Sequence, residues 1–382
     1  MSHRVAVVGV GPGRETDISG RSHAFAYEHA DAYRDRDGCD VVACADVVPE
    51  YVDRFAAEYD VPEDGVYEDY EAMLDSVDPD LVSVCTPIPT HADIVIGCAE
   101  HGSVEAVHCE KPMARTWAGA RAMVHVCDRE GVQLTFGHQR RFGDPFRRAK
   151  ELLDDGVVGD LERIEISWGN FFDNGTHSLD LAAMFNDEHR GAWVMGQLDY
   201  STEHVRYGVH TADHAFVSWQ YENGVHGVAA TGDDVPLSDG PYDFYDCWFR
   251  LVGVDGVVEI GRRDGLGLAY RRDGEGWTEV EVADEFDGRV DRAIDDVLDA
   301  LDGGGETELE ARHALNTTEI LFAGHESSCR RGRVELPLAG VYDHPLESLV
   351  EAGEVTPEHE DDRPPHPSET GENEDRDDLR EQ

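Results

Sequence analysis

The stretch Val5-Ala6-Val7-Val8-Gly9-Val10-Gly11 decides the fold of this chain. Consecutive apolar residues that end in glycine are typical of a central strand of a parallel sheet, because such a strand is buried on both faces. Gly9 and Gly11 then allow backbone N–H groups near the start of the next helix to approach a pyrophosphate. Arg14 replaces the third glycine of the usual fingerprint, and Gly20 is the next candidate, after an insertion over residues 12–19.

Short apolar runs and amphipathic segments alternate over the first 136 residues. Strict alternation of strands and helices predicts a parallel sheet with right-handed crossovers, and therefore a Rossmann-type α/β domain. The predicted strands are 5–8, 41–45, 81–85, 104–109 and 132–136, and the predicted helices are 20–36, 49–59, 91–101 and 116–130.

The pattern changes from about residue 138. Several strand-like runs follow one another without helices between them and are joined by turn signals, which indicates a largely antiparallel sheet open on one face. The predicted strands are 161–168, 192–200, 214–221, 225–231, 247–254, 256–261, 266–271 and 277–282, and the predicted helices are 145–155, 175–186, 310–330 and the apolar repeat from Phe286 to Leu301. We therefore expect a C-terminal α+β domain.

A length of 382 residues suits two domains rather than one. We expect a Rossmann domain over residues 1–137 and the α+β domain over 138–345. Residues 351–382 carry 13 acidic residues against 3 arginines, so we expect a disordered acidic tail over 350–382.

The net charge of −50 disfavours nucleic acids and anionic membranes as partners, because both require a basic surface. No apolar run approaches the length of a membrane span, and the N-terminus has no signal-peptide core. The eight cysteines include no Cys-x-x-Cys pair and mostly lie in apolar runs, which indicates reduced thiols in a cytoplasmic protein.

Lysine is almost absent from the chain. Only Lys111 and Lys150 occur, and the other 30 basic residues are arginine. An acidic chain with so little lysine is typical of a protein from a high-salt cytoplasm, where salt screens the repulsion between carboxylates.

Asp46 ends the predicted second strand. A carboxylate at this position accepts hydrogen bonds from the ribose diol of an adenine nucleotide and repels a ribose phosphate. The residue therefore predicts NAD as the cofactor, with NADP as the alternative.

Four groups of residues occur in an order and spacing that resemble a known family. They are Gly20-Arg21-Ser22-His23, Thr86-Pro87 with His91, Glu110-Lys111-Pro112, and Asp173 with His177. Together they resemble the Gfo/Idh/MocA oxidoreductases, which include glucose–fructose oxidoreductase and inositol dehydrogenase.

The resemblance covers roughly residues 4–340. It implies that Thr86, Pro87, His91 and Glu110 contribute to cofactor binding, and that the second domain binds a sugar, polyol or inositol. It also implies that the open sheet forms the interface of a homo-oligomer.

Lys111 is the first candidate for a catalytic residue, because lysine is nearly eliminated elsewhere. An arginine does not readily give up a proton, whereas a partly desolvated lysine can share one. In the resembled family the matching lysine binds the reacting hydroxyl.

Asp173 and His177 stand four residues apart and would share one face of a helix. We expect Asp173 to raise the pKa of the His177 imidazole and to orient it as a proton acceptor. His177 is therefore the predicted general base, and Asp173 is predicted to contact the substrate.

Arg141 and His214 are predicted to lie on the substrate side. His210 and His214 have the i,i+4 spacing of zinc ligands on a helix, but their surroundings predict loop and strand, and no metal is expected. Two alternatives to the dehydrogenase remain: an NAD-using glycosidase with transient oxidation, and a nucleotide-sensing regulator without turnover.

Overall fold

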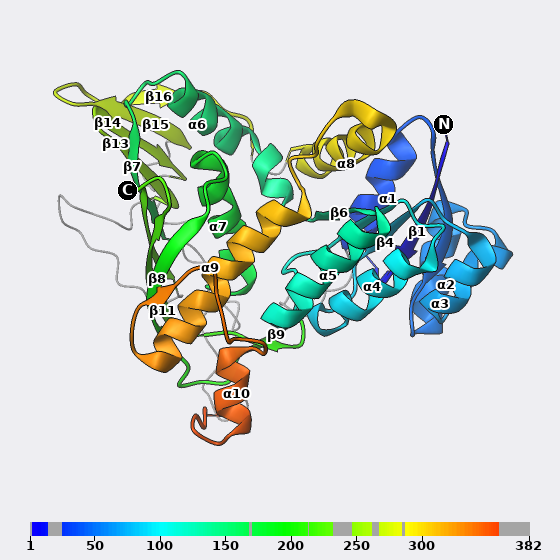
Figure 1. Cartoon of the computed structure of the whole chain (residues 1–382). Coiled ribbons are helices and arrows are strands. Elements are labelled where there is room, and N and C mark those ends of the chain that lie inside the picture. The colour runs from blue at the N-terminus through cyan, green and yellow to red at the C-terminus, as the bar shows by residue number, and fades with distance from the viewer. Residues whose placement is uncertain are drawn as a thin grey trace, which may run out of the picture.

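The computed structural model describes residues 2–13, 25–167, 170–212, 214–231, 247–261, 267–284 and 287–358. Its elements form two lobes, each built around one sheet, and helix α9 (Ala311–Arg330) runs between the lobes (Figure 1). The predicted fold class, a Rossmann domain followed by a domain with an open sheet, is confirmed.

The first sheet has six parallel strands in the order β3-β2-β1-β4-β5-β6. Its strands are β1 (His3–Val8), β2 (Cys39–Ala45), β3 (Val66–Tyr67), β4 (Leu81–Val84), β5 (Ala106–Cys109) and β6 (Gln133–Phe136). The helices of this lobe are α1 (Phe25–Asp35), α2 (Pro49–Tyr59), α3 (Tyr70–Val77), α4 (His91–His101) and α5 (Trp117–Glu130), with 3-10 turns η1 (Glu63–Gly65) and η2 (Ile88–Thr90). Every residue of β4 and β5 is buried, as expected where helices cover both faces of a sheet.

The strand order reverses between β1 and β4, which both pair with neighbours running in the same direction. Such a switch point opens a crevice at the carboxyl ends of the strands, where nucleotides bind in doubly wound sheets. The glycine turn after β1, the residue after β2 and the loop after β4 all meet at this edge.

The second sheet has nine strands in the order β16-β15-β14-β13-β7-β12-β11-β8-β17. Its strands are β7 (Leu161–Ile166), β8 (Gly191–Asp199), β11 (His214–Tyr221), β12 (His226–Thr231), β13 (Phe249–Gly253), β14 (Gly256–Ile260), β15 (Leu268–Arg272), β16 (Thr278–Val280) and β17 (Val334–Glu335). All described pairs are antiparallel except β12 with β7, in agreement with the predicted largely antiparallel sheet.

Helices cover one face of this sheet, and α9 packs directly on β8. The helices of the second lobe are α6 (Asp144–Asp154), α7 (Asp173–Phe185), α9 and α10 (Pro345–Glu351), with the short turn η3 (Gln139–Phe142). Helix α8 (Arg289–Asp299), which continues into η4 (Ala300–Gly304), packs on α1 of the first lobe. On the other face Met195 and Phe216 are 53% and 55% exposed, so apolar side chains lie open there.

The two lobes share one continuous apolar core. Trp117 of α5 and Phe322 of α9 both belong to it, with ring centroids 6.3 Å apart. A backbone bridge between Thr135 of β6 and Glu310, the residue before α9, reinforces the junction. The lobes are therefore joined by packed side chains and by a backbone bridge as well as by the connecting chain.

Several segments differ from the sequence-based expectations. The helix predicted over 20–36 is described only as α1, and Gly20 lies outside the described residues. The predicted tail from residue 350 is described as far as Glu358, which forms a parallel bridge with Thr202; residues 359–382 lie outside the described part. Among the described residues, no helix has the length and apolar character needed to cross a membrane.

Candidate active site

An ion pair between Lys111 and Asp173 forms the centre of the site. Lys111 lies two residues after β5, and Asp173 is the first residue of α7, so the pair joins the two lobes. Lys111 Nζ donates a hydrogen bond of 2.7 Å to Asp173 Oδ1, and the two side chains are only 9% and 6% exposed. Two desolvated charges cost free energy that a single pair rarely recovers in stability, so their retention here indicates a role in function.

Asn170 holds Asp173 in place. Its Oδ1 accepts hydrogen bonds from the backbone N–H groups of Asp173 (2.6 Å) and Asn174 (3.3 Å). Phe172 occupies the N-cap position of α7, and Asn170 satisfies two of the N–H groups that the start of a helix leaves without intrahelical partners. These hydrogen bonds fix the direction in which Asp173 leaves the helix.

His177 lies one turn further along α7 and is buried. Its Nδ1 has no hydrogen-bond partner within the described part of the chain. Burial, and then the positive charges of Lys111 and Arg140, hold the pKa of His177 well below its usual range. The imidazole is therefore neutral and can accept a proton.

The pKa of His177 is lowered, whereas the sequence predicts that it is raised. The sequence predicts that the Asp173 carboxylate raises the pKa of the imidazole, but the carboxylate is paired with Lys111 instead. The lysine charge and the loss of water around the ring both favour the neutral form.

His138, which follows β6, packs against the ring of His177. Its Nδ1 lies 3.3 Å from Asp180 Oδ1, its Nε2 lies 3.0 Å from Thr176 Oγ1, and its ring meets that of His177 edge-on at 5.7 Å. Burial lowers the pKa of His138, and a neutral ring can donate to the carboxylate and accept from the hydroxyl. Sequence reasoning missed His138, whose only signal is its position after the last Rossmann strand.

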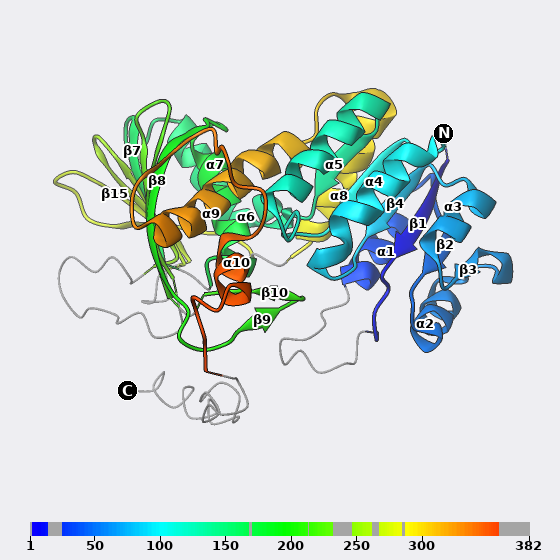
Figure 2. The same ribbon diagram turned by 60° about the horizontal axis from the view of Figure 1, so that its bottom comes forward.

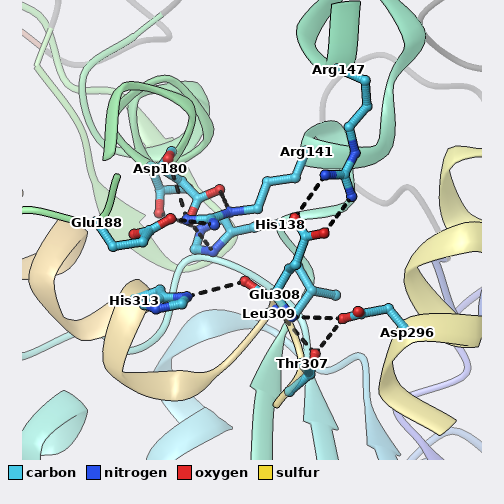
Figure 3. Close-up of polar contacts among 11 residues, drawn as sticks. His138, Arg141, Arg147, Asp180, Glu188, Asp296, Thr307, Glu308, Leu309 and His313 are labelled. Atoms are coloured by element: carbon cyan, nitrogen blue, oxygen red, sulfur yellow. Dashed lines mark hydrogen bonds and ion pairs between the residues drawn. The ribbon is translucent and has the colours of Figure 1, made fainter. Parts of the chain in front are cut away.

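Arg141 is only 2% exposed. Its guanidinium group points toward Asp180 and Glu188 (Figure 3). Its Nε and Nη2 donate to the two carboxylate oxygens of Asp180 at 2.6 and 2.7 Å, and Nη1 donates to Glu188 at 2.6 Å. The sequence predicts a guanidinium that faces the substrate, whereas the structure shows one that is occupied by two carboxylates. Arg141 therefore fixes Asp180 beneath His138.

The glycine turn and Asp46 form a cradle at the switch point. Gly9 has a φ of +83°, and a Cβ placed there would lie 2.5 Å from Thr86 Cγ2 and 2.7 Å from the Thr86 nitrogen. Asp46 Oδ2 accepts from the Gly11 N–H at 2.9 Å, and Oδ1 accepts from the Val48 N–H at 3.0 Å. Each carboxylate oxygen keeps a second lone pair, so the residues present fit the pyrophosphate and ribose of a dinucleotide.

Glu110 and His91 lie beneath this cradle rather than on it. Glu110 Oε1 is 3.2 Å from Nε2 of the buried His29. Burial opposes the charged form of His29, but Cys85 and Glu110 outweigh it and raise the pKa of His29 to about 10. His91 Nε2 lies 2.8 Å from the Thr86 carbonyl and Nδ1 lies 3.0 Å from the Pro112 carbonyl, so this ring connects the loops after β4 and β5.

Pro87 and His214 are the remaining predicted site residues. Pro87 precedes the turn η2, and His214 begins β11, where it pairs with Asp199 of β8. Within the described ranges no hydrogen bond joins His214 to Lys111 or His177, and no cluster of three metal-ligating side chains occurs there.

Replacement of Gly9 by alanine is expected to weaken NADH binding by at least about tenfold, because the new Cβ displaces the backbone of Thr86. Titration of NADH fluorescence measures the change. Gly274→Ala is the matched control, since Gly274 also has a positive φ of +79° but open space around it. An equal loss of binding in both variants would contradict the role of the Gly9 turn.

The comparisons with known proteins agree with this geometry. Residues 3–138 match the family model for oxidoreductases with an NAD-binding Rossmann fold. D-apiose dehydrogenase from Paraburkholderia graminis is 28% identical over 344 residues, which cover 82% of this chain and 87% of that protein. Inositol 2-dehydrogenase from Rhizobium meliloti is 30% identical over 169 residues, 40% of this chain and 49% of that protein.

One solved structure shows how far the fold extends. An inositol dehydrogenase homologue from Azotobacter vinelandii, in complex with NADH and myo-inositol, superposes with a TM-score of 0.69 at 18% identity, over 87% of this chain and 97% of its own. Both sheets are therefore common to the two molecules. The Rossmann domain of this chain, residues 3–138, therefore matches the Gfo/Idh/MocA family of NAD-binding oxidoreductases, and D-apiose dehydrogenase is similar to the chain over most of its length.

Proposed function

We propose that this protein is an NAD-dependent dehydrogenase that oxidises a secondary hydroxyl of a sugar, polyol or inositol. The observation that carries the proposal is the buried Nδ1 of His177, which has no hydrogen-bond partner among the described residues and lies beside the desolvated pair of Lys111 and Asp173. Alcohol oxidation requires a neutral base that accepts the hydroxyl proton and, close to it, a group that donates a hydrogen bond to the hydroxyl oxygen.

Three side chains have different roles at the substrate hydroxyl. Lys111 donates a hydrogen bond to the hydroxyl oxygen, Asp173 holds the ammonium group in place, and His177 accepts the hydroxyl proton. The C–H bond gives up its hydrogen as a hydride as the C=O bond forms, and a dinucleotide held by Gly9 and Asp46 would supply the acceptor for that hydride. The positive charge of the ammonium group stabilises the alkoxide character that develops on oxygen.

The names of the relatives support the substrate class. D-apiose and inositol, on which the two dehydrogenases above are named to act, both carry several hydroxyls on adjacent carbons. A site built from a lysine, a carboxylate and imidazoles suits such polyhydroxylated molecules, which present many hydrogen-bond donors and acceptors.

The decisive experiment measures absorbance of reduced nicotinamide with NAD or NADP and a panel of pentoses, hexoses, their phosphates, inositols and polyols. Molar KCl is included because the chain carries a net charge of −50. Turnover with one class of substrate is the expected result. Tight NADH binding with silence across the panel would instead favour the transiently oxidising glycosidase or the regulator without turnover.

The open face of the nine-stranded sheet supports a homo-oligomer. Met195 and Phe216 project from the neighbouring strands β8 and β11 on this face, and both are more than half exposed. We propose that a second copy of the chain covers them, because large apolar side chains gathered on one face usually mark an interface.

A further inference from the structure

A small hairpin extends from the second lobe toward the first lobe (Figure 2). Strands β9 (Val205–Arg206) and β10 (Val209–His210) are antiparallel and are joined by the two-residue loop Tyr207-Gly208. Both loop residues have positive φ, +50° and +82°, as in a type I′ turn.

Tyrosine is an unfavourable residue at the first position of this turn. Asparagine, aspartate and glycine are strongly preferred there because a bulky side chain is strained at positive φ. Strain of this kind persists where the surrounding structure requires the side chain, and it is concentrated at functional sites.

Contacts at both ends hold the hairpin in position. At its tip, a Cβ placed on Gly208 would lie 2.9 Å from Cγ of Pro89, in the turn η2 that follows β4. At its base, the His210 N–H donates to Glu347 of α10 at 3.3 Å. Thr211 Oγ1 reaches Oδ1 of Asn170, which holds Asp173 in place, at 3.4 Å.

The Tyr207 side chain lies over the ion pair of the site. Lys111 Nζ is 6.0 Å from the centroid of the Tyr207 ring. Burial, and then the Asp173 carboxylate, raise the pKa of Tyr207, so the hydroxyl keeps its proton. In the part of the chain that the structure describes, this hydroxyl makes no hydrogen bond to another side chain.

We propose that Tyr207 is a substrate-binding residue that gives the site its preference for polyhydroxylated substrates. Its ring covers the pair of Lys111 and Asp173 and limits the access of water. Its hydroxyl binds a second hydroxyl of the substrate, adjacent to the one whose proton passes to His177. The inference rests on the proposed dehydrogenase function and extends it to substrate recognition.

The Tyr207→Phe variant keeps the ring and removes the hydroxyl, so it tests the role of the hydroxyl alone. With the polyol of highest turnover in the panel, we expect KM for the polyol to rise about tenfold, the value of one neutral hydrogen bond, while KM for NAD stays unchanged. With the analogue that lacks the adjacent hydroxyl, wild type and Tyr207→Phe are expected to have equal KM. A rise that is the same for both substrates, or no rise, overturns the inference.

The Tyr207→Asn variant removes the ring and keeps a residue that suits the turn, so it tests the role of the ring apart from the turn. Asparagine is favoured at this position, so the variant is expected to unfold at the same temperature as the wild type or higher, while kcat falls at least about tenfold. Parallel loss of thermal stability and activity would assign Tyr207 a structural role and overturn the inference. A wild type that binds NADH but oxidises none of the panel would overturn the proposed function itself, which a failure of the Tyr207 variants alone would not.

Discussion

Replacement of Lys111 by methionine is expected to lower kcat/KM for the polyol by about 10²- to 10³-fold, the usual loss when one donor to a developing oxyanion is removed. Methionine keeps most of the apolar stem and removes the ammonium group that donates to Asp173. NADH affinity, measured by fluorescence titration, is expected to change less than about twofold, because the cradle of Gly9 and Asp46 is untouched.

A matched double variant separates this catalytic loss from a loss of stability. Lys111→Met alone leaves Asp173 buried without its partner, which costs roughly 3–5 kcal/mol when a buried pair is broken. In Lys111→Met/Asp173→Asn both charges are gone, so thermal stability should return while turnover does not. Recovery of turnover along with stability would show that the lysine is structural.

Replacement of His177 by alanine is expected to lower kcat by about 10²- to 10⁴-fold, the range for the loss of a positioned general base. The pH profile should change as well. The low pKa of His177 keeps the wild-type imidazole neutral, so wild-type kcat should persist as the pH falls below about 6.5, the ordinary value for histidine.

The His177→Ala variant should depend on pH in a different way. Without an internal base, its residual rate relies on solvent and should rise with pH. Rates of both proteins between about pH 5 and 9, with thermal unfolding recorded alongside, provide the measurement. A variant that keeps the wild-type pH profile would show that another group accepts the proton.

The sequence predicts the cofactor edge well because a single rule of topology applies there. Parallel strands place their carboxyl ends at one edge, so Gly9, Asp46, Thr86 and Lys111, which follow four different strands, are expected to gather there. The order of the strands confirms that their ends meet at the switch point. No knowledge of side-chain packing is needed for this step.

The sequence does not specify which charged side chains pair with one another. Asp173 could be assigned to His177 because they are one helical turn apart, but its actual partner, Lys111, lies 62 residues away in the chain. Arg141 likewise pairs with Asp180 across 39 residues. Periodicity specifies which face of an element is apolar, whereas with 82 acidic residues the choice of a buried partner depends on how the lobes dock.

The hairpin that carries Tyr207 is not predicted from the sequence, for a different reason. Its strands are only two residues long, and the turn lacks the asparagine or aspartate that normally announces a type I′ hairpin. The feature that hides the turn is the same strained tyrosine on which its proposed role depends.

The last strand, β17, has a consequence for the synthesis of the protein. Val334 and Glu335 pair with β8, whose other edge pairs with β11, so β8 keeps an open edge until residue 335 has left the ribosome. By then the six strands of the first lobe have long been available to fold, because chains fold from the N-terminus as they emerge. A nascent or truncated chain that stops before Val334 exposes that edge to other chains, and is therefore the form of this protein most prone to aggregate.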